Sequence, residues 1–415
     1  MTEKTPHAAR PPPRRPGWSE PRRVGHDLIA GSLRPPPAAS GARSACMTRP
    51  CSSPASRLRA STGLVFGGHE VRRGSMREAA LEVGSDSGTI PPELVEALGD
   101  ELDRIDHEIR PGVLPNAGRA ISGIADAELR EDARSLERMV DDLVRDIAGF
   151  RERNDLDRVV VVNLSSTEPP LEVRPGHADL AGFERILAED DKQAVRPSML
   201  YALAAARTGS PFLHFTPSAA TLAPAIVEAF ERAGVPFMGR DGKTGETLVK
   251  SALAPMFKYR NLKVLSWQGY NLLGDRDGLV LSDPENLDSK VKTKDSLLAN
   301  ILGYDLHTHV GIDYVPSLGD QKTAWDFIHF EGFLGHRMSM QFVWQGCDAV
   351  LAAPLVLDMV RVLDHAATRG AVGAQRQLAC FFKRPFGMEE DDLHRQWHML
   401  EDWVRQEREA LGLDG

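Results

Sequence analysis

A chain of 415 residues is too long for one small domain, so we expect two domains of ordinary size or one large α/β enzyme. Apolar residues make up 42% of it, enough for a core, and the net charge of −9 argues against a nucleic-acid partner. No apolar run approaches the roughly 20 residues that a membrane span needs. The four cysteines include no CxxC pair, which favours a reducing, cytoplasmic setting.

Residues 1–60 form an arm of unusual composition. They hold ten Arg and one Lys against three acidic residues, a net charge of +8, whereas the rest of the chain carries −17. Eleven of the 28 prolines lie here, in runs that make neither helix nor central strand, so we predict a disordered arm. Three readings stay open: a transit peptide, a flexible tail that binds an acidic partner, or a GC-rich gene translated out of register, which we favour.

The first predicted elements after the arm are a short strand with its loop at residues 63–75, then helices. Residues 77–109 are largely helical in pattern, and residues 127–153 predict one long charged helix. Next, four consecutive valines at 159–162 predict a strand buried on both faces, as in a parallel sheet. Ligands of open α/β sheets bind at the carboxyl ends of strands. Candidate cofactor contacts are therefore Asn163, Ser165, Ser166 and Thr167, with an ordinary strand-end turn as the alternative.

Strand and helix then alternate along the chain. A strand at residues 211–218 leads to a helix through Ala233, and a strand from Gly234 leads through a glycine-rich turn to a helix through Leu253. This alternation predicts a doubly wound sheet. The turn, GRDGKTGET, fails as a Walker A loop because Phe237 stands where the first glycine is needed. It still suits an anion or a diphosphate edge, and a purely structural turn is the alternative.

From Leu262 the pattern changes to that of a second unit. Strand-like stretches at residues 262–271, 306–316 and 338–346 predict a more antiparallel α+β unit. A helix from Asp348 to about Arg369 then leads back toward the first unit. A charged helix at residues 389–411 ends the chain.

Four lysines are candidates for chemistry. Lys290 and Lys294 are four residues apart and would share a helix face, where two cations repel each other unless an anion or a developing oxyanion lies between them. Lys322 and Lys383 lie in less charged surroundings, where lysines often do chemistry. Taken alone this signal is weak, because any long chain contains such lysines.

Two histidines raise the question of a metal site. His307 and His309 alternate on a predicted strand, so both face the same side, and that spacing suits a metal ion. No carboxylate or cysteine partner is evident nearby. We therefore prefer an ordinary surface or core pair and predict no metal site.

Five segments in a fixed order carry a family resemblance. They are NLLGDRDG at 271–278, SKVKTKD at 289–295, GDQK at 319–322, CDAVLAAPLVLD at 347–358 and FFKRP at 381–385. Their order and spacing resemble the myo-inositol-phosphate synthase family, NAD-dependent enzymes that cyclise glucose 6-phosphate. The resemblance extends from about Leu64 to the C-terminus.

The resemblance implies a two-domain architecture. A doubly wound, Rossmann-like NAD-binding domain, incomplete at its N-terminus, would comprise residues 61–246 and 363–415. An inserted α+β catalytic and tetramerisation domain would comprise residues 247–362. A cytoplasmic homotetramer acting in inositol and phospholipid biosynthesis is the expected form, and a divalent cation is left open as a second cofactor.

The resemblance also implies a reaction and its residues. NAD oxidises C5 of glucose 6-phosphate, enolisation and attack of C6 on the C1 aldehyde close the ring, and the ketone is reduced again. Each step builds negative charge on an oxygen, which lysine ammoniums stabilise. The implied catalytic residues are Lys290, Lys294, Lys322 and Lys383, with Asp320 and Asp348 as their partners. The implied cofactor contacts add Asp241, Thr244 and Asp358 to the strand-end residues. The implied substrate contacts are Asn271, Asp275 and Asp277.

Within these implied roles, Lys290 and Lys322 take the oxyanions and the proton transfers at C5 or C1, while Lys294 and Lys383 take the phosphate and the ring hydroxyls. The chain departs from the family pattern at two positions. It has Asp275 where the family prefers Asn, and Asp295 where it prefers Ser, and both changes make the site more acidic.

One family element has no counterpart in residues 1–70. The family begins with a strand, a GxGG-type loop and a helix that seat the pyrophosphate. The glycines of the arm are isolated, and Gly67 and Gly68 are not followed by a helix start. Three hypotheses follow: an active synthase with a misread or unusual N-terminus, a non-catalytic relic or sugar-phosphate-binding protein, and an ordinary NAD-dependent dehydrogenase.

Overall fold

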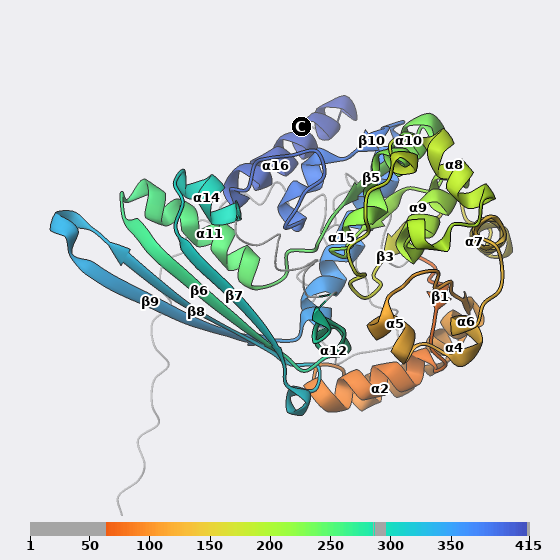
Figure 1. Cartoon of the computed structure of the whole chain (residues 1–415), viewed down its shortest axis with the longest axis horizontal. Coiled ribbons are helices and arrows are strands. Elements are labelled where there is room, and N and C mark those ends of the chain that lie inside the picture. Colours follow the sequence, from red (N-terminus) through yellow and green to blue (C-terminus); the bar gives the residue numbers. More distant parts are fainter. Residues whose placement is uncertain (1–63, 285, 287–295, 413–415) are drawn as a thin grey trace, which may run out of the picture.

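The computed structural model describes residues 64–284, 286 and 296–412. The predicted arm, and Lys290 and Lys294, lie outside the described residues. Figure 1 shows two parts side by side: a rounded part in which helices surround a parallel sheet, and a long open sheet that extends away from it. The region where these two parts meet is where a site between two domains is expected.

The rounded part is built on a four-stranded parallel sheet. Its strand order is β10-β5-β4-β3. The strands are β3 (Val161–Asn163), β4 (Phe212–His214), β5 (Pro236–Gly239) and β10 (Gly373–Ala374).

Neighbouring residues on these strands are buried on opposite faces. Phe212 and Phe237 pack with helices α9 (Pro197–Arg207) and α10 (Pro224–Ala233), whereas Leu213 and Met238 pack against the C-terminal helices. Successive side chains of a strand point to opposite faces, so both faces of this sheet are covered by helices. This arrangement confirms the predicted doubly wound α/β fold.

The chain before this sheet is mainly helical, as predicted, with one correction. The single helix expected at residues 127–153 is two helices, α6 (Ala127–Arg130) and α7 (Leu136–Arg153). The second begins after Ser135, whose hydroxyl accepts a hydrogen bond from the Arg138 amide and caps the new helix. The remaining elements of this region are β1 (Gly68–Glu70), α2 (Met76–Ser87), α3 (Pro92–Ala97), α4 (Gly99–His107), β2 (Ile109–Pro111) and α5 (Arg119–Ile124). Helix α8 (Leu180–Ala188) follows β3.

The second part is a four-stranded mixed sheet of order β7-β6-β8-β9. Its strands are β6 (Lys263–Leu273), β7 (His307–Tyr314), β8 (Lys322–Glu331) and β9 (Arg337–Gly346). Strand β6 runs parallel to β7 and antiparallel to β8, which is in turn antiparallel to β9. Strand β8 was not expected from sequence, because Trp325 and Phe327 on one face and Ile328 and Phe330 on the other hide the alternation of a half-buried strand.

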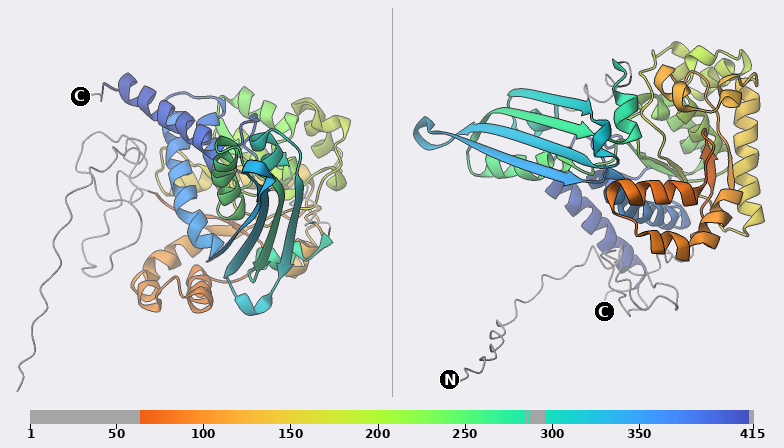
Figure 2. Two further views of the ribbon diagram at one scale, coloured as in Figure 1. Left: turned by 90° about the vertical axis from the view of Figure 1, so that its left-hand side faces the viewer. Right: turned by 90° about the horizontal axis from the view of Figure 1, so that it is seen from below.

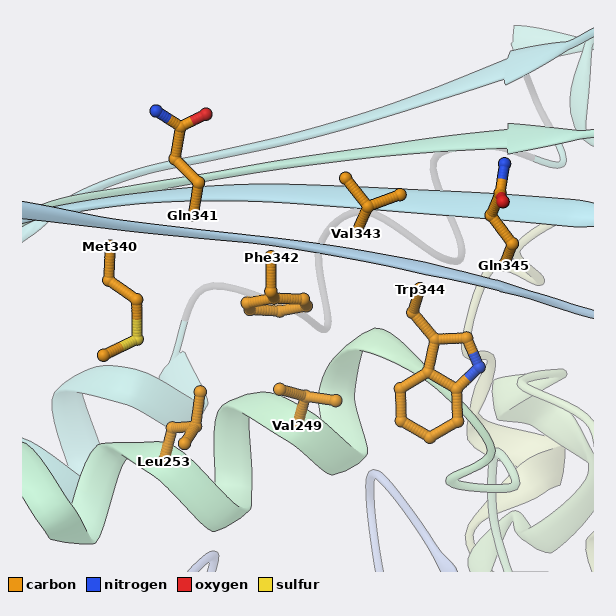
Figure 3. A pocket seen from close by; sticks show the side chains of 8 residues that line it. All are labelled: Val249, Leu253, Met340, Gln341, Phe342, Val343, Trp344 and Gln345. Atoms are coloured by element: carbon orange, nitrogen blue, oxygen red, sulfur yellow. The ribbon is translucent and has the colours of Figure 1, made fainter. Parts of the chain in front are cut away.

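Among the described elements, two helices cover one face of this sheet and leave the other face open, as the view from below in Figure 2 shows. Helices α11 (Glu246–Tyr259) and α14 (Ser296–Leu302) pack on it through a core that includes Phe257, Trp267 and Ile328. Side chains of the edge strand β9 alternate between the two faces, as Figure 3 shows. Met340, Phe342 and Trp344 point toward α11, whereas Gln341, Val343 and Gln345 point away from it.

The chain then returns to the parallel sheet. Helix α12 (Arg276–Leu281) follows β6, and α15 (Asp348–Thr368) leads back as predicted. Helix α16 (Leu393–Ala410) begins later than expected, because Asp392 accepts a hydrogen bond from the His394 amide and caps it. The short 3₁₀ helices are Pro175–His177, Lys192–Ala194, Ala219–Leu222, Pro316–Leu318, Phe333–Gly335 and Arg376–Phe381. Within the described part of the chain, none of the helices combines the length and apolar character needed to cross a membrane.

Candidate active site

A polar cavity lies where the two parts of the molecule meet. The start of α11, the ends of β6 and β7, the first residues of β8 and α15, and the loop after the last 3₁₀ helix all reach it. Four predicted site residues line it: Asn271, Lys322, Asp348 and Lys383. The full lining is Gly245, Glu246, Thr247, Asn271, Leu273, Ile312, Lys322, Asp348 and Lys383.

Lys322 and Asp348 form the first ion pair of this cavity. The Lys322 Nζ lies 2.9 Å from Asp348 Oδ2, and the Thr244 hydroxyl donates to Oδ1 of the same carboxylate at 3.2 Å. Asp348 is the first residue of α15, where the positive end of the helix dipole favours a carboxylate. One carboxylate thus holds both an amine and a hydroxyl at the cavity.

A glycine makes room for the Lys322 amine. A Cβ atom on Gly245 would lie 2.9 Å from Lys322 Nζ, closer than side-chain carbons approach other heavy atoms. The glycine-rich turn therefore lets the α11 backbone pass close to the amine. This is a steric reason for glycine that its sequence pattern alone does not reveal.

Lys383 and Asp241 form the second ion pair. Lys383 Nζ lies 2.8 Å from Asp241 Oδ1, and the Lys383 amide donates to the Asp241 carbonyl at 2.7 Å. Asp241 has a left-handed backbone (φ 62°), a conformation that aspartate tolerates better than most residues. Its side chain is buried, so the amine provides the opposite charge that a buried carboxylate needs.

Three charged residues at or near the cavity were missed by the sequence analysis. Glu246 lines it and pairs with Lys250 one turn along α11, both deeply buried. Their spacing of four residues on a helix predicts an ion pair, but it does not predict burial, because such pairs are usually exposed. Lys243, in the same glycine-rich turn, donates to Gln396 Oε1 at 2.8 Å, and burial lowers its pKa to about 8.

The predicted strand-end residues lie at the carboxyl edge of β3. Asn163 Nδ2 donates to His214 Nδ1 at 3.2 Å, and the Ser165 amide donates back to Asn163 Oδ1 at 3.1 Å. His214 Nε2 faces the Ser218 carbonyl at 2.8 Å, so the proton is on Nε2 and Nδ1 is the acceptor. Burial lowers the pKa of His214 to about 4, which keeps the ring neutral. The ends of β3 and β4 are therefore joined through neutral polar groups.

The exposed positions of this loop offer donors to a ligand. Ser165 is exposed, Ser166 is half-buried, and Thr167 is buried with its carbonyl accepting from Asn286 Nδ2 at 2.7 Å. Doubly wound folds bind their ligands at the carboxyl ends of strands, where these donors lie. These donors suit the polar groups of a ligand bound at this strand end.

Besides the strand-end residues, Asp241 and Thr244, four further predicted residues are absent from the lining of the cavity. Asp275 caps α12, accepting from the Gly278 amide at 2.7 Å, and Asp277 lies in the first turn of that helix. Asp320 lies in the loop before β8. Asp358 pairs with Arg361 at 3.2 Å, ten residues along α15 from Asp348, and burial raises its pKa to about 6.

The two histidines lie on the surface of the mixed sheet. His307 and His309 are both exposed on β7, and the His309 ring lies 5.4 Å from that of Tyr270. Among the residues that the structure describes, no group of three or more His, Cys, Asp or Glu side chains is arranged to hold a metal ion.

Comparison with known proteins identifies the family. A model of an NAD-binding family, described as myo-inositol-1-phosphate synthase, matches residues 56–405. The chain belongs to the myo-inositol-1-phosphate synthase family. Inositol-3-phosphate synthase 1 of Bacteroides thetaiotaomicron is 34% identical over 355 residues, which cover 82% of this chain and 80% of that protein. The synthase family is therefore established over most of the chain, and NAD is the cofactor its fold indicates.

Solved structures of the synthase family agree with this assignment. Inositol-3-phosphate synthase from Caenorhabditis elegans superposes with a TM-score of 0.73 at 25% identity, covering 82% of this chain and 70% of that one. A myo-inositol-1-phosphate synthase-related protein from Thermotoga maritima superposes with a TM-score of 0.65 at 26% identity, covering 82% and 86%. The reading as an ordinary dehydrogenase is therefore wrong at the level of family.

Proposed function

We propose that the protein is an inositol-3-phosphate synthase, which converts D-glucose 6-phosphate to 1D-myo-inositol 3-phosphate by oxidation at C5, cyclisation and re-reduction. The observation that carries this proposal is the pairing of Lys322 with Asp348 and of Lys383 with Asp241 at one cavity. The synthase names of its relatives support it. They give no support to a non-catalytic relic.

The strand-end loop after β3 is the proposed seat of the cofactor. Asn163, Ser165, Ser166 and Thr167 would hold it there, with Thr244 and Asp241 at the side of the cavity. Bound NAD supplies reversible hydride transfer at C5 of the sugar. Asp358 remains a proposed cofactor contact from the resemblance alone.

The two amines of the cavity have separate proposed roles. Lys322 donates a hydrogen bond to the oxygen that becomes negative during enolisation and ring closure, and Asp348 holds the amine in place. A preorganised donor in a site sheltered from water stabilises such an oxyanion far better than water does. Lys383 binds the phosphate or ring hydroxyls, with Lys290, Lys294 and Asp320 as further proposed site residues.

Asn271, at the wall of the same cavity, is the proposed contact of a substrate hydroxyl. Asp275 and Asp277 complete the proposed substrate contacts.

The open face of the mixed sheet is the proposed surface of assembly. Tyr270, Trp325 and Val343 are all on this face and keep 36%, 38% and 61% of their surface exposed. Tyr270 and Trp325 stack with their ring centroids 5.7 Å apart. Large apolar side chains gathered on one open sheet face mark an interaction surface. We propose a homotetramer formed through this face, with residues 247–362 as the inserted domain.

The remaining parts of the proposal concern location and partners. The cysteines within the described ranges, Cys347 and Cys380, are both buried and free, which supports a cytoplasmic protein. Glucose 6-phosphate is the proposed substrate, and no nucleic-acid or membrane partner is proposed.

The decisive experiment is a product assay. The purified chain is incubated with NAD⁺ and glucose 6-phosphate, with and without a chelator, and the cyclitol phosphate is detected by phosphorus and proton NMR. We expect inositol phosphate to form without net production of NADH, and Lys322→Ala to abolish it. Binding of glucose 6-phosphate without any product would instead support a sugar-phosphate-binding protein.

A further inference from the structure

Three polar side chains form a buried cluster beside the cavity. Glu246 Oε1 pairs with Lys250 Nζ, and Glu246 Oε2 accepts a hydrogen bond from Asn271 Nδ2. Each of the three keeps only 3% of its surface exposed. Glu246 and Asn271 line the cavity, whereas Lys250 does not. The cluster therefore connects an amine outside the cavity to an amide at its wall.

A glycine of the neighbouring strand β6 leaves room for this cluster. A Cβ atom on Gly269 of β6 would collide with Glu246 Oε1 and lie 3.1 Å from Lys250 Nζ. An exposed glutamate–lysine ion pair four residues apart adds little stability. Burying such a pair removes the hydration of both charges, which costs free energy. Close packing of such a costly pair against a glycine beside a catalytic cavity indicates a role beyond stability.

The chemistry of the cluster fixes the orientation of the Asn271 amide. An ionised carboxylate can only accept hydrogen bonds, so the atom that faces Glu246 must be the Asn271 nitrogen. The same nitrogen also faces the Gly311 carbonyl at 3.5 Å. Asn271 therefore directs its amide hydrogens into the protein and offers its carbonyl oxygen as an acceptor.

We propose that Lys250 is a positioning residue: it holds Glu246 as a carboxylate, and Glu246 holds the Asn271 carbonyl oxygen ready to accept a hydrogen bond from a hydroxyl of the sugar phosphate. This inference rests on the proposed function of the cavity. It adds Lys250, which touches no reacting atom, to the residues on which the proposed reaction depends. A neutral Glu246 donates as well as accepts, so the Asn271 amide loses its fixed orientation.

The test replaces Lys250 by methionine, which keeps the length of the side chain and removes its charge. Losing the ammonium that pairs with it makes the charged form of the buried Glu246 carboxylate less favourable, so the carboxylate takes up a proton as the pH falls. Among the described residues, the other charged groups near it include Asp326 on β8, opposite Gly269, and the Lys322–Asp348 pair at the cavity. All of these groups are unchanged in the variant.

The readout is the affinity for glucitol 6-phosphate, which has no aldehyde and cannot cyclise, measured by calorimetry with NAD⁺ present from pH 6 to pH 9. We expect Lys250→Met to weaken binding about 10-fold to 100-fold at neutral pH, with affinity recovering as the pH rises and Glu246 ionises again. The Lys250→Met, Glu246→Gln double variant should lose this pH dependence, because glutamine does not titrate.

A matched control and two outcomes make the test decisive. Lys258→Met removes another amine of α11, one that donates to the Ile301 carbonyl at 2.7 Å, and should leave the affinity unchanged. Equal affinities of wild type and Lys250→Met at every pH would overturn this inference and leave the proposed function standing. A loss of affinity that does not vary with pH would do the same. A wild-type chain that neither binds the analogue nor forms product would overturn the proposed function, and the inference with it.

Discussion

Lys383 Nζ lies 2.8 Å from Asp241 Oδ1, although 142 positions separate the two residues in the chain. Their backbones are also joined, and the neighbouring Lys243 amide donates to the Phe381 carbonyl at 2.8 Å. Two loops at the edge of the parallel sheet therefore hold one ion pair at the cavity. This double attachment fixes the amine in a way that a flexible surface lysine lacks.

Removing the Lys383 amine should reduce turnover far more than stability. We expect Lys383→Ala to lower kcat/KM about 100-fold or more, because a positioned cation at a developing or bound anion contributes on this scale. Asp241→Asn keeps the left-handed backbone, which asparagine tolerates, but leaves the amine without its opposite charge, and it should also lower activity. The measurement is inositol phosphate production together with thermal unfolding. Full activity of Lys383→Ala would exclude it from the site.

A single methyl group at Gly245 should displace the second amine. The Cβ of Gly245→Ala would lie 2.9 Å from Lys322 Nζ, so the amine has to move away from Asp348. We expect turnover to fall about 100-fold, as for other small displacements of catalytic groups, with little change in NAD affinity. Gly123→Ala is the matched control, because its Cβ meets nothing within 4 Å. Similar kinetics of the two variants would show that Lys322 does not act at that position.

The sequence predicted much of the fold because local patterns specify local structure. Four valines before Asn163 indicated β3, and the helix at α15 was predicted almost to the residue. Strand β8 was missed because apolar side chains on both of its faces remove the period of two that marks a strand. The break before α7 was missed because the polar pattern continues through it, and only the cap at Ser135 marks the new start.

The site was predicted in its parts but not in its pairings. Separate motifs predicted Lys322, Asp348 and Lys383 as site residues. Their spacing in sequence does not predict that Lys322 Nζ lies 2.9 Å from Asp348 Oδ2. Glu246 and Lys250 were missed because a pair four residues apart on a helix is usually solvated, whereas here β6 covers it. Lys290 and Lys294 lie outside the described residues and stay predictions.

A charge on the open face of the mixed sheet should break the proposed tetramer. Trp325 stacks on Tyr270 there, so we expect Trp325→Glu to give smaller species, because a carboxylate buried between copies would lose its hydration. Lys258→Glu, on the exposed side of α11, is the control and should leave assembly unchanged. Light scattering after gel filtration measures the mass. A tetramer that survives Trp325→Glu would place the interface elsewhere.

Acid should destabilise the protein through His214. Burial lowers the pKa of His214 from 6.5 to about 4, so between these values the unfolded chain binds a proton that the folded chain does not. Stability therefore falls as the pH drops from 6.5 to 4, by about 3 kcal/mol in total, and this contribution is constant above pH 6.5. The folded chain takes up this proton only near pH 4, and protonation of Nδ1 there would remove the acceptor of the Asn163 amide, so NAD affinity should weaken near pH 4.

Denaturant unfolding at several pH values tests this for wild type and His214→Gln. Whatever the variant does to overall stability, the difference between the two should change by about 3 kcal/mol between pH 6.5 and pH 4, because glutamine does not titrate. His398→Gln, which removes an exposed histidine of α16, should show no such change. Parallel curves for wild type and His214→Gln would mean that His214 is not kept neutral by burial, and that the β3 edge is open to water.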